Sequence, residues 1–140
     1  MIQIGSNDGK RFDNLNNFIK KFKPIGILVE PIKSNFENLK KNYLNQENIF
    51  FENLAISVDG KIDHLFKVKE DKLHLYDEHI VGITSFKKEH LIRHGVKNKH
   101  IVKEIVNAIS INDLLKKYKL EKLDLLYIDT EGYDGEIVID

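Results

Sequence analysis

The sequence predicts an α/β protein whose core is a doubly wound, mostly parallel β-sheet, and three observations support this. First, Ile25–Val29 and Leu123–Ile128 are short, nearly continuous apolar runs, typical of strands covered on both faces. Second, the segments between such runs place apolar residues at helical spacing. Third, strands and helices alternate along the chain, an order that favours parallel strands joined by helices.

The chain opens with one βαβ unit. Ile2–Ile4 predicts a strand, and Gly5–Gly9 predicts a turn that contains two glycines. Phe12–Phe22 then places its apolar side chains on one helical face, and Ile25–Val29 forms the second strand.

A second helix and a third strand are predicted next. Ser34 and Glu37 have the spacing of a capping box just after Pro31, which predicts that a helix starts there. Its apolar stripe contains Phe36, Leu39 and Tyr43, and Ile49–Phe51 then begins the third strand.

The middle of the chain departs from this alternation. Asp59-Gly60 is a hairpin signal between Ala55–Val58 and Lys61–Val68, and it predicts a local antiparallel excursion. Residues 69–83 are charged and have no clean period, so they are expected to form an insertion or a lid-like loop.

The remaining elements are regular, and the length fits a single domain over residues 1–140. They are predicted in this order: a helix over Phe86–His94, a strand over Ile101–Val106, a helix over Ile111–Tyr118 capped by Ser110 with Asp113, the strand Leu123–Ile128, and the start of a helix over Gly132–Asp140.

Composition excludes several classes of function. Lys and Arg total 22 and Asp and Glu total 22, so the formal net charge is 22 − 22 = 0, and no global positive field for nucleic acid is expected. Cysteine is absent, which excludes disulfide scaffolds, thiolate metal sites and cysteine nucleophiles. No apolar run approaches the ~20 residues of a membrane span, and no signal peptide is visible. These features point to the cytoplasm.

The turn Gly5–Gly9 is the first candidate site. It lies between a strand and a helix, where free backbone N–H groups favour a phosphate or carboxylate, although such a turn can also be purely structural. Glu30 ends the second strand 30 − 9 = 21 residues after Gly9, close to the spacing of a carboxylate that binds ribose hydroxyls. The alternative for Glu30 is a solvated charge at a strand end.

The details of this turn narrow the ligand class. Asn7 occupies the place of the second glycine of a dinucleotide fingerprint, and the third glycine is missing. No Gly-Lys-Ser/Thr follows, so a P-loop is excluded. A cofactor that carries ribose, adenine and an amino-acid end fits better. A nicotinamide-dependent oxidoreductase remains the weaker alternative.

Five segments together resemble the FkbM family of S-adenosylmethionine-dependent methyltransferases, in order and spacing. The resemblance implies a Rossmann-like class I methyltransferase sheet, S-adenosyl-L-methionine as cofactor, and methyl transfer to a hydroxyl oxygen of a sugar, glycan or secondary metabolite. The segments are Gln3–Gly9, Leu28–Pro31, Asn53–Ser57, Gly82–Phe86 and Asp124–Gly132.

The resemblance also implies roles for individual residues. Glu30 would accept hydrogen bonds from both ribose hydroxyls, and Leu54 and Ala55 would lie against adenine. Asp129 would lie beside the methyl donor. The methionine end of the cofactor would be held by the loop after the first strand, namely Gly5, Ser6, Asn7, Asp8 and Gly9.

Gln3 departs from the family pattern, because many of these enzymes have an acid at this position that holds the methionine amino group. Gln3 could accept through its amide oxygen, or Asp8 could supply the charge.

A hydroxyl acceptor needs a base, and Asp129 and Glu131 are the catalytic candidates by position. The alternatives are a carboxylate that structures the turn for Asp129, and a salt-bridged loop residue for Glu131. His90 and His94 have a metal-binding spacing but no evident third ligand, so no metal site is predicted. Thr84 and Ser85 fit the family pattern or a helix N-cap equally well.

Only part of a class I sheet can be assigned before the chain ends, which predicts a C-terminally truncated domain. A non-catalytic methyltransferase-like binding module or a truncated remnant is therefore the second hypothesis. An uncovered sheet edge would favour self-association.

Overall fold

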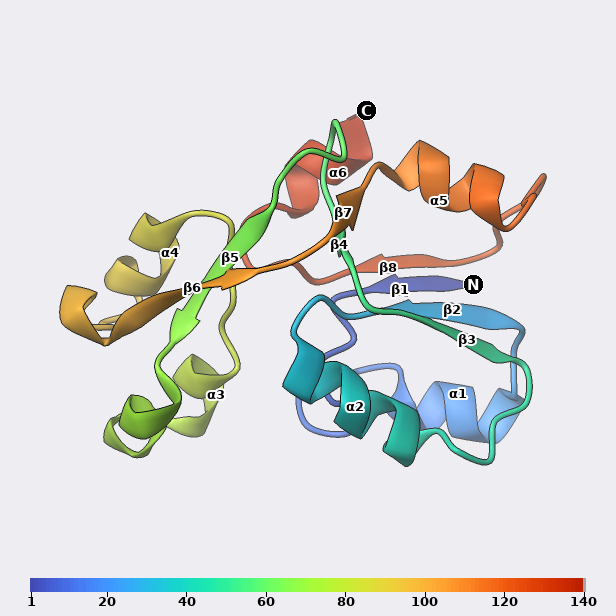
Figure 1. The fold of residues 1–140 in the computed structure, drawn as a ribbon. Helices are drawn as coiled ribbons and strands as arrows, with labels where there is room; N and C mark the ends of the chain where they lie inside the picture. The colour runs from blue at the N-terminus through green and yellow to red at the C-terminus, as the bar shows by residue number, and fades with distance from the viewer. Residues whose placement is uncertain (140) are drawn as a thin grey trace.

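The computed structural model describes residues 1–139, which fold around a four-stranded parallel sheet with a smaller lobe beside it (Figure 1). The strand order β3-β2-β1-β8 confirms the predicted α/β class. All three pairings in this sheet are parallel. Its strands are β1 (Ile2–Ile4), β2 (Gly26–Val29), β3 (Ile49–Glu52) and β8 (Leu126–Ile128).

Helices cover both faces of this sheet, as a doubly wound fold requires. Figure 1 shows α1 (Asn16–Phe22) and α2 (Lys33–Asn42) on one face. The other face is covered by α5 (Ile111–Lys117) and α6 (Asp134–Ile139).

The residues of β2 alternate between these two layers. Ile27 and Val29 pack in one core with Leu114 of α5 and Ile137 of α6. Leu28 packs in the other core, whose remaining buried members are Ile19, Leu39, Tyr43 and Ile49. All four residues of β2 are buried, which explains why its sequence is an uninterrupted apolar run.

The predicted hairpin around Asp59-Gly60 is wrong. Gly60 does lie in a turn with φ +67°, but the strand before it, β4 (Ala55–Ile56), pairs in parallel with β7 (Ala108–Ile109). The strand after it, β5 (His64–Val68), pairs antiparallel with β6 (Ile101–Ile105). Both partners come from a distant part of the sequence, so a local turn signal could not reveal them.

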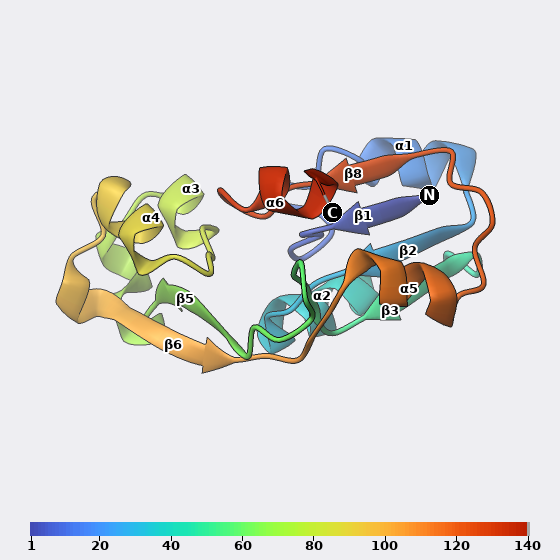
Figure 2. The same ribbon diagram turned by 90° about the horizontal axis from the view of Figure 1, so that it is seen from above.

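The lobe comprises residues 64–105, and it joins the sheet domain beside β4 and β7 (Figures 1 and 2). Its buried core consists of Val68, Ile83, Leu91, Val96 and Ile101. Residues 69–83 lie within the lobe. The segment between β5 and β6 folds as η1 (Glu70–Leu75), α3 (Glu78–Val81), α4 (Lys88–Arg93) and η2 (Asn98–His100).

One of the two predicted helix caps is confirmed. Ser110 Oγ accepts a hydrogen bond from the backbone N–H of Asp113 at 3.0 Å, at the start of α5. The capping box of Ser34 and Glu37 is wrong, because the N-cap of α2 is Ile32 and has no side-chain cap. The Glu30 carboxylate instead accepts the Ile32 N–H at 2.9 Å, and the N-cap Ile32 lies two residues before the predicted cap Ser34.

Helix α1 starts later than its apolar spacing predicts. Phe12 has a left-handed backbone with φ +58°, which no α-helix accommodates. The Asp13 carboxylate accepts the backbone N–H of Leu15 at 2.9 Å, so the first helical residue is Asn16.

Within residues 1–139, the structure contains no helix with the length and apolar character that crossing a membrane requires.

Candidate functional site

Two adjoining recesses open at the carboxyl ends of β1, β2 and β8. This is where parallel α/β sheets bind ligands, because β1 is the strand at which the sheet order reverses. The recesses share Gly5, Glu30, Thr84 and Asp129 in their walls. Their open volumes are about 390 Å³ and 840 Å³.

The two recesses differ in chemistry. The smaller, called here the apolar recess, is lined beyond the shared residues chiefly by Leu54, Ala55, Ile56, Leu65 and Phe86. The larger, called here the polar recess, is lined beyond them by Asn7, Phe12, Asn14, Asn35, His79, Gly82 and Glu131. The walls of both recesses therefore come partly from the sheet domain and partly from the lobe.

Gly5 is required where β1 turns into the loop. Its φ is +80°, and a Cβ there would lie 1.9 Å from the carbonyl oxygen of Asp129. The N–H groups of Gly5 and Ser6 both donate to the Val29 carbonyl at 3.0 Å. The ends of β1, β2 and β8 therefore meet at one point of the cavity wall.

Glu30 is a buried carboxylate at the end of β2, with 4% of its surface exposed. One carboxylate oxygen accepts the N–H of Asn7 and the other accepts the N–H of Ile32, both at 2.9 Å. Burial raises the pKa of Glu30 to about 7, although these hydrogen bonds oppose the shift. Each oxygen keeps accepting capacity for a further donor from the cavity.

Of the five loop residues predicted to hold a cofactor, only Gly5 and Asn7 line the cavity. Ser6 is fully buried and directs its hydroxyl to the Gln3 carbonyl at 3.3 Å. At Gly9 a Cβ would lie 2.5 Å from the Tyr43 ring, so this glycine allows the loop to pack on α2.

The Asp8 carboxylate is engaged within its own loop. It accepts the backbone N–H groups of Lys10 and Arg11 at 2.9 Å and 2.7 Å, and it pairs with Arg11 Nε at 2.8 Å. Burial alone raises the pKa of Asp8, but these contacts outweigh it and hold the pKa below its ordinary value. Asp8 therefore shapes the loop.

Gln3 lies under the loop and is 1% exposed. Its amide nitrogen donates to the Asp13 carboxylate at 2.8 Å. Its amide oxygen is buried and has no hydrogen-bond partner among the residues that the structure describes. A buried acceptor without a donor is costly. Gln3 lines neither recess.

Asp129 and Glu131 follow β8, and both line the polar recess. Burial raises the pKa of Asp129, and the neighbouring carboxylates of Glu131 and Asp134 raise it further. Asp134 accepts the N–H and the hydroxyl of Thr130 at 2.6 Å and 2.8 Å, which fixes the turn between them.

Glu131 is held from the lobe. Ser85 Oγ donates to the Glu131 carbonyl at 3.1 Å, and His90 Nε2 lies 3.6 Å from the Glu131 carboxylate. A Cβ on Gly132 would lie 2.9 Å from the His90 ring, so the ring fits there because Gly132 has no side chain. Thr84 lines the cavity, whereas Ser85 ties the lobe to the sheet domain.

Strained backbone is concentrated in this cavity. Among residues 1–139, five residues other than glycine have positive φ, and three of them, Asn7, Phe12 and Glu131, line the polar recess. Such conformations cost roughly 1–3 kcal/mol each, persist where the surrounding structure imposes them, and tend to cluster at ligand sites.

Sequence reasoning missed most of the cavity wall outside the loop and the strand ends. Leu65, His79, Phe12, Asn14 and Asn35 line the cavity, and none belongs to the five segments that carry the family resemblance. Asn35 follows the misjudged cap at Ser34, and Phe12 was assigned to a helix. Asn35 lies in the regular helix α2 and Leu65 in the strand β5, so their place in the wall follows from tertiary packing. Phe12 has helical spacing in the sequence but a left-handed backbone in the structure.

The rings of His90 in α4 and of its C-cap His94 lie with centroids 4.5 Å apart, tilted by 46°. Among residues 1–139, no group of three histidine, aspartate or glutamate side chains converges on a point where a metal ion could bind.

The parallel sheet with a glycine-bearing loop after β1 and a buried carboxylate after β2 defines an α/β protein with a ligand cavity at the carboxyl edge of its sheet. A family model described as the methyltransferase FkbM domain matches residues 3–139. The chain therefore belongs to the FkbM methyltransferase family, and its sheet is that of a Rossmann-like methyltransferase. Searches of curated proteins and of solved structures found no match.

Proposed function

We propose that the chain binds S-adenosylmethionine and transfers its methyl group to a hydroxyl oxygen of a sugar, glycan or other polyhydroxylated metabolite. The observation that carries this proposal is the buried Glu30 carboxylate at the junction of an apolar and a polar recess. A ligand with an apolar base, a ribose and a polar amino-acid end would meet matching surfaces in that order.

The walls fit the parts of such a cofactor. Leu54 and Ala55 in the apolar recess would hold adenine, and Glu30 would accept from the ribose hydroxyls. Gly5 and Asn7 would border the methionine end. Gln3 lines neither recess, so its buried amide oxygen does not face the ligand in this arrangement.

The bound cofactor would supply an electrophilic methyl carbon, so the protein has to orient the acceptor and remove a proton. Asp129 and Glu131 are the candidates to accept that proton, since both carboxylates line the polar recess. The raised pKa of Asp129 favours it as the proton acceptor, because a carboxylate with ordinary acidity is a weak base at neutral pH.

The lining of the polar recess supports a neutral acceptor. It presents three side-chain amides, those of Asn7, Asn14 and Asn35, beside the Phe12 ring. Among the residues that the structure describes, no lysine or arginine lines this recess, whereas phosphorylated ligands are usually bound by such cations. Amides donate to and accept from hydroxyl groups, which suits a polyhydroxylated ligand.

Calorimetric titration of the chain with S-adenosylmethionine tests the cofactor assignment. Glu30→Gln should weaken binding by about tenfold or more, because hydrogen bonds to a charged acceptor are lost. Glu52→Gln is the matched control, since Glu52 is a buried carboxylate at the end of β3 that pairs with Lys117 and Tyr118 away from the cavity.

Absence of binding by the wild-type chain would contradict the proposal. Equal losses in Glu30→Gln and Glu52→Gln would contradict the ribose role of Glu30. A parallel titration with NAD⁺ should give no heat of binding, and a signal there would favour the oxidoreductase alternative.

A further inference from the structure

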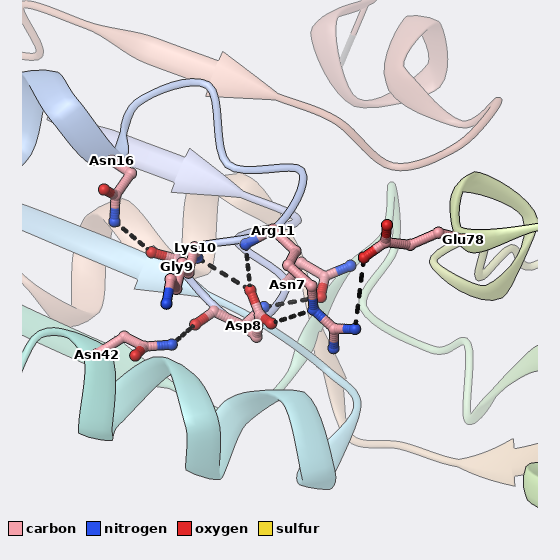
Figure 3. A network of polar contacts seen from close by, with 8 residues as sticks. All are labelled: Asn7, Asp8, Gly9, Lys10, Arg11, Asn16, Asn42 and Glu78. Carbon is pink, nitrogen blue, oxygen red and sulfur yellow. Dashed lines mark hydrogen bonds and ion pairs between the residues drawn. The ribbon is translucent and has the colours of Figure 1, made fainter.

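The loop Gly5–Gly9 is held from beneath by two asparagine side chains. Asn42 of α2 donates to the Asp8 carbonyl at 2.8 Å, and Asn16 of α1 donates to the Gly9 carbonyl at 2.5 Å (Figure 3). Two successive helices, α1 and α2, therefore fix consecutive carbonyls at the end of the loop.

Tyr43 connects this support to the protein interior. It is 1% exposed, its ring packs under Gly9, and its hydroxyl lies 3.3 Å from the Asn16 amide nitrogen. The hydroxyl donates to the Asp13 carboxylate at 2.7 Å. Burial and the adjacent carboxylate raise the pKa of Tyr43 above its ordinary value, so the phenol stays protonated and remains a donor.

Asp13 is the centre of the network. One carboxylate oxygen accepts from Gln3 Nε2 at 2.8 Å and from the N–H of Leu15 at 2.9 Å, and the other accepts from Tyr43. The network thereby joins β1, the start of α1 and the end of α2 directly under the loop. Neither Asp13 nor Tyr43 lines the cavity, so neither is placed to contact a ligand there.

The network also fixes the orientation of the Gln3 amide. Because its nitrogen is bound to Asp13, its oxygen is the end left without a donor. Asp13 therefore fixes which end of the buried Gln3 amide is bound within the network.

We propose that Asp13 and Tyr43 are positioning residues that hold the Gly5–Gly9 loop in its ligand-binding conformation before any ligand arrives. The loop contains the Asn7 N–H that reaches Glu30, and ordering such a loop at the moment of binding would reduce affinity. The effect on cofactor affinity rests on the proposed function, whereas the effect on loop order does not.

Tyr43→Phe removes only the hydroxyl and is the primary test. Tyr118→Phe is the matched control, because the Tyr118 hydroxyl also donates to a carboxylate, that of Glu52 at 2.6 Å, but lies away from the loop. In hydrogen exchange followed by mass spectrometry, peptides covering residues 5–9 should exchange about tenfold faster in Tyr43→Phe and at the wild-type rate in Tyr118→Phe.

Titration with S-adenosylmethionine supplies the second readout. Tyr43→Phe should weaken binding about tenfold, and Tyr118→Phe should leave it unchanged even if both variants melt at lower temperature. If Tyr43→Phe does not fold, Asn16→Asp, which removes the donor to the Gly9 carbonyl, replaces it in both experiments.

The outcomes separate the two proposals. A wild-type chain that binds no S-adenosylmethionine contradicts the proposed function, and the exchange experiment then still decides the role of Tyr43. Wild-type exchange in the loop of Tyr43→Phe, or a loop that loosens equally in Tyr118→Phe, overturns the positioning role.

Discussion

The backbone N–H of Asn7 donates to the Glu30 carboxylate across 2.9 Å, which ties the loop after β1 to the end of β2. Asn7 has a left-handed backbone with φ +49°. The sequence pattern is a glycine-bearing loop followed about 20 residues later by an acid. In the structure the loop and the acid are joined by this one hydrogen bond.

Cofactor binding should strengthen as the pH rises through about 7. Burial raises the pKa of Glu30 to about 7, so this carboxyl is largely neutral at about pH 6 and largely charged at about pH 8. The charged form is the better acceptor for hydroxyl donors. Calorimetry with S-adenosylmethionine should show the affinity rising over this range in the wild type and less in Glu30→Gln. Parallel pH profiles would contradict the assignment.

The same group should affect stability in the opposite direction. Because the pKa of Glu30 is higher in the folded protein than in the unfolded chain, its contribution to stability is greatest at low pH and is lost as the pH rises through about 7. We therefore expect the unfolding free energy of the wild type, relative to that of Glu30→Gln, to fall between about pH 5 and about pH 8. Denaturant unfolding of both proteins measures it. A constant difference would show that Glu30 titrates alike in both states.

Gly5→Ala should destabilise the protein by about 2–4 kcal/mol, because a methyl group there combines a left-handed backbone with a collision against the Asp129 carbonyl. Gly135→Ala is the control, since a Cβ at that helical position meets nothing within 4 Å. Alanine at Gly135 should be neutral or stabilising by up to about 1 kcal/mol. Thermal unfolding measures both, and a mild effect of Gly5→Ala would mean that the ends of β1 and β8 can separate.

Two serines that look alike in sequence should behave differently. Ser110→Ala should cost about 1 kcal/mol, because the Ser110 hydroxyl caps α5 by accepting the Asp113 N–H. Ser34→Ala should change the unfolding free energy little, because Ser34 lies inside the first turn of α2 and caps nothing. Denaturant unfolding distinguishes the two, and a comparable loss in Ser34→Ala would contradict the helix start at Lys33.

The parts of the fold that were predictable from sequence are those determined by local patterns. Gly26–Val29 is apolar because both faces of β2 are buried, and the spacing of Ser110 and Asp113 fixes a cap within four residues. The positions of Gly5 and Glu30 in the cavity wall also follow from a short loop and the end of the next strand.

The rest depends on contacts between distant segments. β4 pairs with β7 and not with the strand that follows its turn, and nothing in the turn at Gly60 reveals this. Two further features depend on specific local side-chain contacts that have no periodic pattern: Arg11 directs the Asp8 carboxylate, and Asp13 sets the helix start at Asn16. The room for the His90 ring depends on Gly132, forty-two residues away by 132 − 90 = 42.

The pairing of β4 with β7 has a consequence for how this protein can diversify. The chain leaves the sheet domain next to the point where it returns, because Ala55 and Ala108 are register partners. A segment inserted between adjacent strand ends can change in length and sequence without altering the parallel sheet. The sheet supplies Gly5 and Glu30, whereas the inserted segment supplies Leu65, Thr84 and Phe86. One half of the cavity wall is therefore built by the parallel sheet and the other half by a segment that leaves and re-enters the sheet domain at one point.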